Sequence, residues 1–156
     1  MDNHSKGRLL VTIQFILLGG LVFISSDDIF AGNKTIDTVG GTLEFLGFLV
    51  VILGFGGLGK SLTANPVPLK QAQLITNGIY SRVRHPIYLG LVLATLGMTL
   101  SSGSQIKFLF WVLLVALFAL KIKFEEAMLI QTYPAYRDYQ AKVPGLIPNL
   151  IPKRLK

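Results

Sequence analysis

The sequence predicts an all-α, polytopic membrane protein with about four transmembrane helices. Of the 156 residues, 51% are hydrophobic and only 15% are charged, whereas about a quarter of the residues in a soluble domain are charged. The charged residues lie in short stretches between long apolar runs. The net charge of +7 is therefore no sign of nucleic-acid binding, which needs basic residues gathered on a polar surface. These observations exclude an ordinary soluble globule and indicate one membrane-embedded domain over residues 1–156.

Four apolar runs are the candidate membrane spans. A span needs about 20 residues, because the bilayer core is about 30 Å thick and a helix rises about 1.5 Å per residue. The first run follows Lys6 and Arg8 as a signal peptide would, but no clean cleavage site follows it, so we expect a retained span. The third run is short, and lysines at the ends of the fourth can reach the interface. The runs are residues 9–25, 39–59, 86–101 and 106–124, and these lysines are Lys107, Lys121 and Lys123.

The charges between the runs predict the orientation of the protein. The N-terminal segment, the second loop and the C-terminal region are basic, whereas the first loop is acidic and the third is uncharged. Lysine and arginine concentrate on the cytoplasmic side of membrane proteins. We therefore expect both termini in the cytoplasm, and the absence of cysteine, together with this loop bias, favours a prokaryotic inner membrane.

The C-terminal segment, residues 133–156, differs in character from the spans. Pro144, Pro148 and Pro152 recur every fourth residue, and proline breaks helices, so we expect no regular helix here. Tyrosines and scattered apolar side chains suit a segment that lies along the lipid headgroups. The sequence therefore predicts an interfacial tail.

Polar residues at both ends of the C-terminal helical hairpin should converge. Arg84, His85 and Tyr88 stand at the start of the third run, and Glu125 and Glu126 follow the fourth. The third helix is about 22 Å long and the path back along the fourth is about 29 Å. The hairpin therefore returns the two acids to about the depth of the basic residues.

This convergence suits a zwitterionic ligand. Pro86 stands at the first position of the predicted helix, and a helix N-terminus attracts anions. The planar guanidinium group of Arg84 can form paired hydrogen bonds with a carboxylate or a phosphate. Glu125 and Glu126 offer the opposite charge to an ammonium group or to ribose hydroxyls. The alternative interpretation is that the arginines are membrane anchors and the acids form local ion pairs. Glu44 lies near the outer end of the second run, and we interpret it as structural; the cysteine-free sequence suggests no metal site.

The same residues form a longer signature. It reads Gly78-x-Tyr80-x-x-Val83-Arg84-His85-Pro86-x-Tyr88-x-Gly90, followed by the hairpin, Glu125-Glu126, Tyr136, Tyr139 and Val143-Pro144. In these motifs the chain resembles the integral-membrane methyltransferases that include isoprenylcysteine carboxyl methyltransferase and phospholipid methyltransferases. The resemblance covers about residues 74–151.

The resemblance implies S-adenosylmethionine as cofactor, held by the hairpin and covered by a cytoplasmic tail. It also implies methyl transfer to a lipophilic or membrane-associated acceptor, either a small molecule or a lipidated protein, with membrane lipid as a partner and no nucleic acid. The implied cofactor-binding residues are Tyr80, His85, Pro86, Tyr88, Glu125 and Glu126, and the implied catalytic residues are Arg84, Glu126 and Arg137.

Two other functions remain open from the sequence. Some membrane reductases that use NADPH resemble these methyltransferases in their C-terminal half. Alternatively, a small non-enzymatic membrane protein could pack through the glycine-rich second run, where Gly54, Gly56, Gly57 and Gly59 indicate close helix contacts.

Overall fold

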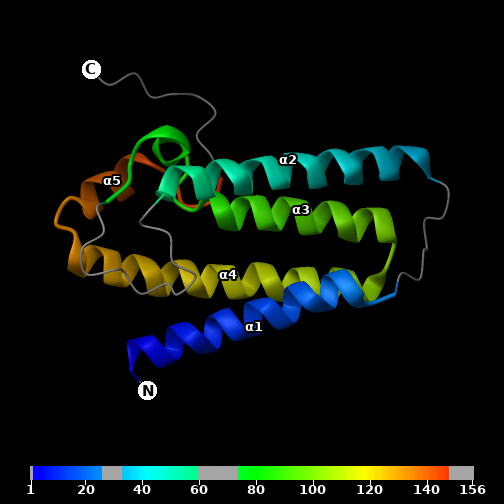
Figure 1. Cartoon of the computed structure of the whole chain (residues 1–156), viewed down its shortest axis with the longest axis horizontal. Helices are drawn as coiled ribbons and strands as arrows, with labels where there is room; N and C mark the ends of the chain where they lie inside the picture. Colours follow the sequence, from blue (N-terminus) through cyan, green and yellow to red (C-terminus); the bar gives the residue numbers. More distant parts are fainter. Residues whose placement is uncertain (1, 26–32, 60–73, 148–156) are drawn as a thin grey trace.

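The computed structural model describes residues 2–25, 33–59 and 74–147. Within these ranges the chain is helical and contains no strand. Four long helices lie side by side along the long axis of the molecule, and the N-terminus and α5 lie at the same end of this axis (Figure 1). The elements are α1 (Asn3–Phe23), α2 (Lys34–Leu58), the 3-10 helix η2 (Gly78–Ser81), α3 (Pro86–Ser102), α4 (Gln105–Thr132) and α5 (Tyr136–Lys142).

The predicted all-α, polytopic membrane architecture is confirmed. Helices α1, α2 and α4 are long and apolar enough to cross a membrane. Helix α3 is apolar but has only 17 residues, which corresponds to about 26 Å and agrees with the short third run. The outer faces of the bundle carry large exposed apolar side chains such as Phe45 and Ile52, as expected for surfaces that meet lipid.

Local signals fix the helix ends. Asn33 caps α2 by accepting a hydrogen bond from the Ile36 N–H, and Ser104 caps α4 in the same way from the Lys107 N–H. Between α3 and α4, Gly103 adopts a positive φ of 59°, a conformation that glycine enters without steric cost. Gly103 and Ser104 alone therefore connect the hairpin, and the two preceding serines belong to α3.

Helix α4 is longer than the sequence predicted. It was expected to end near residue 124, but it continues to Thr132. The charged residues after the apolar run do not interrupt a helix, and the first strong stop signal is Pro134, which disfavours helical geometry in Tyr133. Glu125 and Glu126 therefore lie inside α4 and have fixed directions on its surface.

Helices α2 and α3 touch backbone to backbone. A Cβ atom added to Gly47 would lie 2.3 Å from the amide nitrogen of Ala94, and one added to Gly97 would lie 2.4 Å from the carbonyl oxygen of Gly40. Small residues allow this approach, which favours helix association in lipid through packing. Of the glycines singled out in the sequence, Gly54 belongs to this contact, whereas Gly56 and Gly59 face open space among the described residues.

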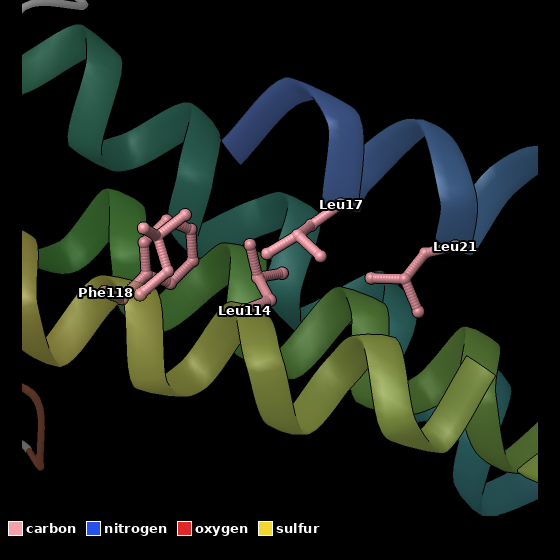
Figure 2. Packing of buried hydrophobic residues seen from close by; sticks show 5 residues of the cluster. Leu17, Leu21, Leu114 and Phe118 are labelled. Carbon is pink, nitrogen blue, oxygen red and sulfur yellow. The ribbon is translucent and has the colours of Figure 1, made fainter. Parts of the chain in front are cut away.

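Helix α1 packs against α4 through aliphatic side chains. Figure 2 shows Leu17 and Leu21 of α1 directed toward Leu114 and Phe118 of α4, and Leu117 completes this buried group. The bundle thus consists of an α2–α3 pair and an α1–α4 pair, which the α3–α4 hairpin joins.

The C-terminal segment corrects the sequence prediction in part. Residues 136–142 form α5, because Pro144 and the later prolines all follow this stretch. Tyr136 was expected among the headgroups, but it is only 1% exposed. Residues 148–156, where the rest of the predicted tail falls, lie outside the described residues.

Candidate functional site

The segment after α5 is hydrogen-bonded to the loop that precedes α3. The amide of Arg84 donates to the carbonyl oxygen of Pro144 at 2.9 Å, and the amide of His85 donates to that of Gly145 at 3.0 Å. The Tyr139 hydroxyl adds a bond to the carbonyl oxygen of Tyr80 at 2.6 Å. These bonds bring the two halves of the sequence signature together at the N-terminus of α3.

Glu126 is the centre of a buried polar network, which we call the Glu126 cluster and which comprises Glu126, Arg84, His85 and Gln140. The Arg84 Nε donates to Glu126 Oε1 at 2.8 Å, and His85 Nε2 lies 3.0 Å from the same oxygen. Gln140 Nε2 donates to the other oxygen at 2.8 Å. The Arg84 Nη1 donates to the carbonyl oxygens of Gln140 and Val143. Arg84 therefore binds groups of the protein itself and fastens α5 to the hairpin.

Glu125 takes a different direction from Glu126, because consecutive residues of an α-helix point about 100° apart. It accepts a hydrogen bond of 3.1 Å from the Tyr88 hydroxyl, and its Oε2 lies 3.8 Å from His85 Nδ1. The Tyr88 ring stacks on His85 and on Phe118, with centroid distances of 5.6 and 4.8 Å. His85 thus stands between the two carboxylates, with one ring nitrogen facing each.

A cavity of about 480 Å³ opens on the Glu125 side of this arrangement. Its volume lies in the range of small-molecule sites, about 300–1,000 Å³. Phe15 and Phe55 line it and are 60% and 44% exposed, so the cavity reaches the surface of the bundle between α1 and α2. The lining residues are Gln14, Phe15, Leu18, Phe55, Leu58, Tyr80, Arg84, His85, Pro86, Ile87, Tyr88, Leu91, Lys121 and Glu125.

Three buried or half-buried tyrosines surround the polar end of the site. Burial raises the pKa of Tyr139 to about 12 and also raises the pKa values of Tyr80 and Tyr136 above their usual range. All three hydroxyls are therefore protonated donors at neutral pH. Tyr80 donates to the carbonyl oxygen of Gly54 at 3.1 Å, whereas the buried Tyr136 hydroxyl has no hydrogen-bond partner within the described ranges.

The structure brings most of the sequence-derived site residues together. Arg84 and Glu126 meet in the Glu126 cluster, and His85 borders both carboxylates. The cofactor candidates Tyr80, His85, Pro86, Tyr88 and Glu125 line the cavity, whereas the sixth candidate, Glu126, is not among its lining residues. Arg137 stands apart: it is exposed on α5 and forms no ion pair with any residue in the described ranges.

Sequence reasoning missed three polar residues. Gln140 belongs to the Glu126 cluster, and Gln14 and Lys121 line the cavity. Lys121 was expected to reach the interface, but its side chain is buried and donates to Gln14 Oε1. Gln14 carried a usable signal, because a polar side chain in the middle of an apolar span is a candidate functional residue.

Comparison with known proteins places this arrangement in a family. Residues 36–136 match the phospholipid methyltransferase family, a region that runs from α2 to the start of α5 and contains the hairpin with both acids. The chain belongs to this family. Its membership agrees with the helical architecture and with the signature shared across the hairpin.

Two individual proteins are similar to this member of the phospholipid methyltransferase family. The protein-S-isoprenylcysteine O-methyltransferase of Schizosaccharomyces pombe is 40% identical over 85 residues, which are 53% of this chain and 36% of that protein. The nickel-cobalt-cadmium resistance protein NccN of Alcaligenes xylosoxydans xylosoxydans is 25% identical over 160 residues, covering 96% of this chain and 67% of that protein. The chain thus matches only about a third of the length of the first relative.

Proposed function

We propose that this protein transfers a methyl group from S-adenosylmethionine to a lipophilic acceptor at the cytoplasmic face of the membrane. The observation that carries the proposal is the cavity, which has Glu125, His85 and Tyr88 at its polar end and phenylalanines at its lipid-facing rim. Family membership and the 40% identical isoprenylcysteine methyltransferase segment support the reaction class.

The residues around the cavity fit the cofactor. Glu125 presents a half-buried carboxylate that suits an ammonium group or ribose hydroxyls, and the Tyr88 ring offers an apolar face. Outside the cavity lining, the Tyr136 hydroxyl has no hydrogen-bond partner among the described residues and is a further buried donor near Glu126. When bound, S-adenosylmethionine would supply a methyl group on a positively charged sulfur, activated for in-line displacement.

The residues of this chain would contribute alignment and exclusion of water. The Glu126 cluster holds α5 and its following segment over the N-terminus of α3, which fixes the direction of His85. Alignment of two reactants removes much of the entropic part of the barrier. An acceptor with a carboxylate needs no general base, whereas an amine or hydroxyl acceptor needs one.

The entrance between Phe15 and Phe55 admits an acceptor directly from the bilayer. The phospholipid and isoprenylcysteine methyltransferases are named for lipid or lipidated substrates, and a chain-like apolar group matches these walls. We therefore infer a membrane-resident acceptor and a cofactor that arrives from the cytoplasm.

Incubation of the purified protein with membrane lipid extract and isotope-labelled S-adenosylmethionine tests the proposal. Mass spectrometry should find label in an organic-soluble product, and heat-inactivated protein should give none. Absence of labelled product from protein that is folded, across lipid extracts and prenylated peptides, would contradict the proposed function.

A further inference from the structure

A chain of three contacts links α1 to the polar end of the cavity. Gln14 of α1 accepts a hydrogen bond from the Nζ of Lys121 on α4. The same Nζ lies 5.1 Å from the centroid of the Tyr88 ring on α3, and the Tyr88 hydroxyl donates to Glu125 Oε2 at 3.1 Å. All four residues line the cavity. Three helices therefore contribute to one continuous polar arrangement, which begins in α1 and ends at Glu125.

Lys121 interacts with both partners of the hydrogen bond between Tyr88 and Glu125. It precedes Glu125 by four residues on α4 and therefore lies on the same face of that helix. The ammonium attracts the Glu125 carboxylate electrostatically. Its place over the Tyr88 ring allows a cation–π interaction, which is strongest where water is excluded, and Lys121 is only 1% exposed. The ammonium is therefore placed to restrain the direction of both side chains.

Gln14 restrains the ammonium in turn. A lysine side chain is a flexible four-carbon stem, and an acceptor on a second helix selects one direction for its Nζ. Gln14 itself lies in the apolar part of α1, where a polar side chain is costly without a hydrogen-bond partner. The residues that match the family begin at residue 36. This support for the cavity therefore comes from a helix outside the matched region.

Glu125 depends on such support more than Glu126 does. Three polar side chains contact the Glu126 carboxylate at distances of 2.8 to 3.0 Å, and the Glu126 side chain is 11% exposed. Glu125 accepts the longer bond from Tyr88, lies 3.8 Å from a ring nitrogen of His85, and is 26% exposed. The direction of the acid that lines the cavity is therefore sensitive to the position of Tyr88 and to the charge of Lys121.

We propose that Lys121 and Gln14 are positioning residues, which hold Tyr88 and Glu125 in the directions that the methyl donor requires. The proposal rests on the function proposed above, because it treats these two side chains as part of a donor site. Lys121 acts through Tyr88 and Glu125, and Gln14 acts through Lys121. Helix α1 thereby contributes to donor affinity although it lies outside the region that matches the family.

Fluorine NMR of the ligand-free, detergent-purified protein tests the positioning without any donor. With 3-fluorotyrosine incorporated in place of Tyr88, the wild type should give one dominant, narrow resonance. Lys121→Met, which keeps the approximate length of the side chain but removes its charge, should broaden or split this resonance, because the ring then samples more than one orientation. Gln14→Leu should act in the same direction, and Lys121→Arg, which keeps the charge, should restore the single resonance.

The affinity for S-adenosylhomocysteine, measured by isothermal titration calorimetry, is the second readout. Lys121→Met should raise the dissociation constant about tenfold, in the range expected for loss of a desolvated cation–π interaction. Gln14→Leu should raise it about threefold, because it removes one hydrogen-bond acceptor and leaves the charge. Lys123→Met and Thr12→Val are the matched controls, since both residues are exposed on the same two helices. The controls should change neither the resonance nor the affinity.

The positioning role would be overturned by an unchanged Tyr88 resonance in Lys121→Met, or by equal changes in Lys121→Met and Lys123→Met. A changed resonance with an unchanged affinity for S-adenosylhomocysteine would also overturn it. If Lys121→Met folds poorly, Gln14→Leu carries the same test, because it leaves the buried charge in place.

The two readouts separate this inference from the proposed function. A Tyr88 resonance that depends on Lys121, in wild-type protein that binds no S-adenosylhomocysteine, would support the restraint of Tyr88 and contradict the proposed function. Binding of S-adenosylhomocysteine that is the same in wild type, Lys121→Met and Gln14→Leu would support the proposed function and contradict this inference.

Discussion

Replacing Arg84 by alanine should release the segment after α4 from the hairpin while the long helices stay in place. Arg84 bonds to Glu126 and to the carbonyl oxygens of Gln140 and Val143, and the Arg84 and Glu126 side chains are each 11% exposed. A hydrogen bond to a charged group contributes about 1.5–3 kcal/mol. The backbone bonds to Pro144 and Gly145 remain in the variant. We therefore expect the free energy of local opening to fall by about 3 kcal/mol, the upper end of that range.

Hydrogen exchange of the peptide spanning residues 136–147 measures this opening directly. A loss of about 3 kcal/mol corresponds to exchange that is about a hundredfold faster. Arg82→Ala is the matched control, since Arg82 is exposed in the same loop and carries the same charge. Arg84→Lys should give an intermediate rate, because lysine keeps the charge but lacks the planar fork.

The reasoning would be refuted by equal exchange in Arg84→Ala and Arg82→Ala. It would also be refuted by faster exchange spread evenly over α1 and α2, because that result would indicate general destabilisation and not release of the C-terminal segment.

Three further predictions concern the packing of α2 on α3, the membrane orientation and the hydrogen bond of Tyr139. Gly47→Leu should sharply reduce the yield of folded protein, because a Cβ at this position would lie 2.3 Å from the α3 backbone. Gly41→Leu should be tolerated, because a Cβ there would have no atom within 4 Å. Size-exclusion chromatography measures the two yields, and equal yields would contradict the close packing of α2 and α3. A cysteine introduced at Ser102 should react with a membrane-impermeant thiol reagent on intact cells, whereas a cysteine introduced at Ser5 should not. The reverse pattern would show that the predicted orientation is wrong. Tyr139→Phe should lower the melting temperature through loss of about 1 kcal/mol. Because the pKa of Tyr139 in the folded protein is raised from 10.0 to about 12, its hydroxyl should stabilise the wild type fully below about pH 10, and this stabilisation should disappear as the pH rises through about 12. A difference in melting temperature between wild type and variant that is unchanged at pH 12 would contradict this.

The meeting of the two polar groups could be predicted because it depends only on helix rise and a short turn. Arg84 and Glu126 are 42 positions apart, yet an antiparallel hairpin returns the second to the level of the first. The special backbone at Gly103 and the start of α3 at Pro86 also follow from residue type.

The different partners that Glu125 and Glu126 contact could not be predicted in the same way. It depends on the rotation of α4 about its axis, and a helix that is apolar nearly all round shows no periodic face from which to read that rotation. The contact of Lys121 with Gln14 depends in addition on which helix α1 packs against. Composition and loop charge carry no information on that choice.

The C-terminal segment shows a different limit. Its prolines were interpreted as excluding helix throughout, but the stretch from Tyr136 to Lys142 contains none. Tyr136 is buried near Glu126 and Arg84, a tertiary arrangement that the local sequence does not reveal.

Ligand-induced stabilisation of the detergent-purified protein tests the central claim most directly. At about 100 times its dissociation constant, S-adenosylhomocysteine should add about 2.7 kcal/mol and raise the melting temperature in a saturable way. The shift should be lost in Glu125→Gln and retained in Glu44→Gln, which removes a half-buried carboxylate from the α2 helix outside the cavity. A saturable shift with NADPH and none with S-adenosylhomocysteine, or no shift with either in folded protein, would contradict a methyl-donor site at the α3–α4 hairpin.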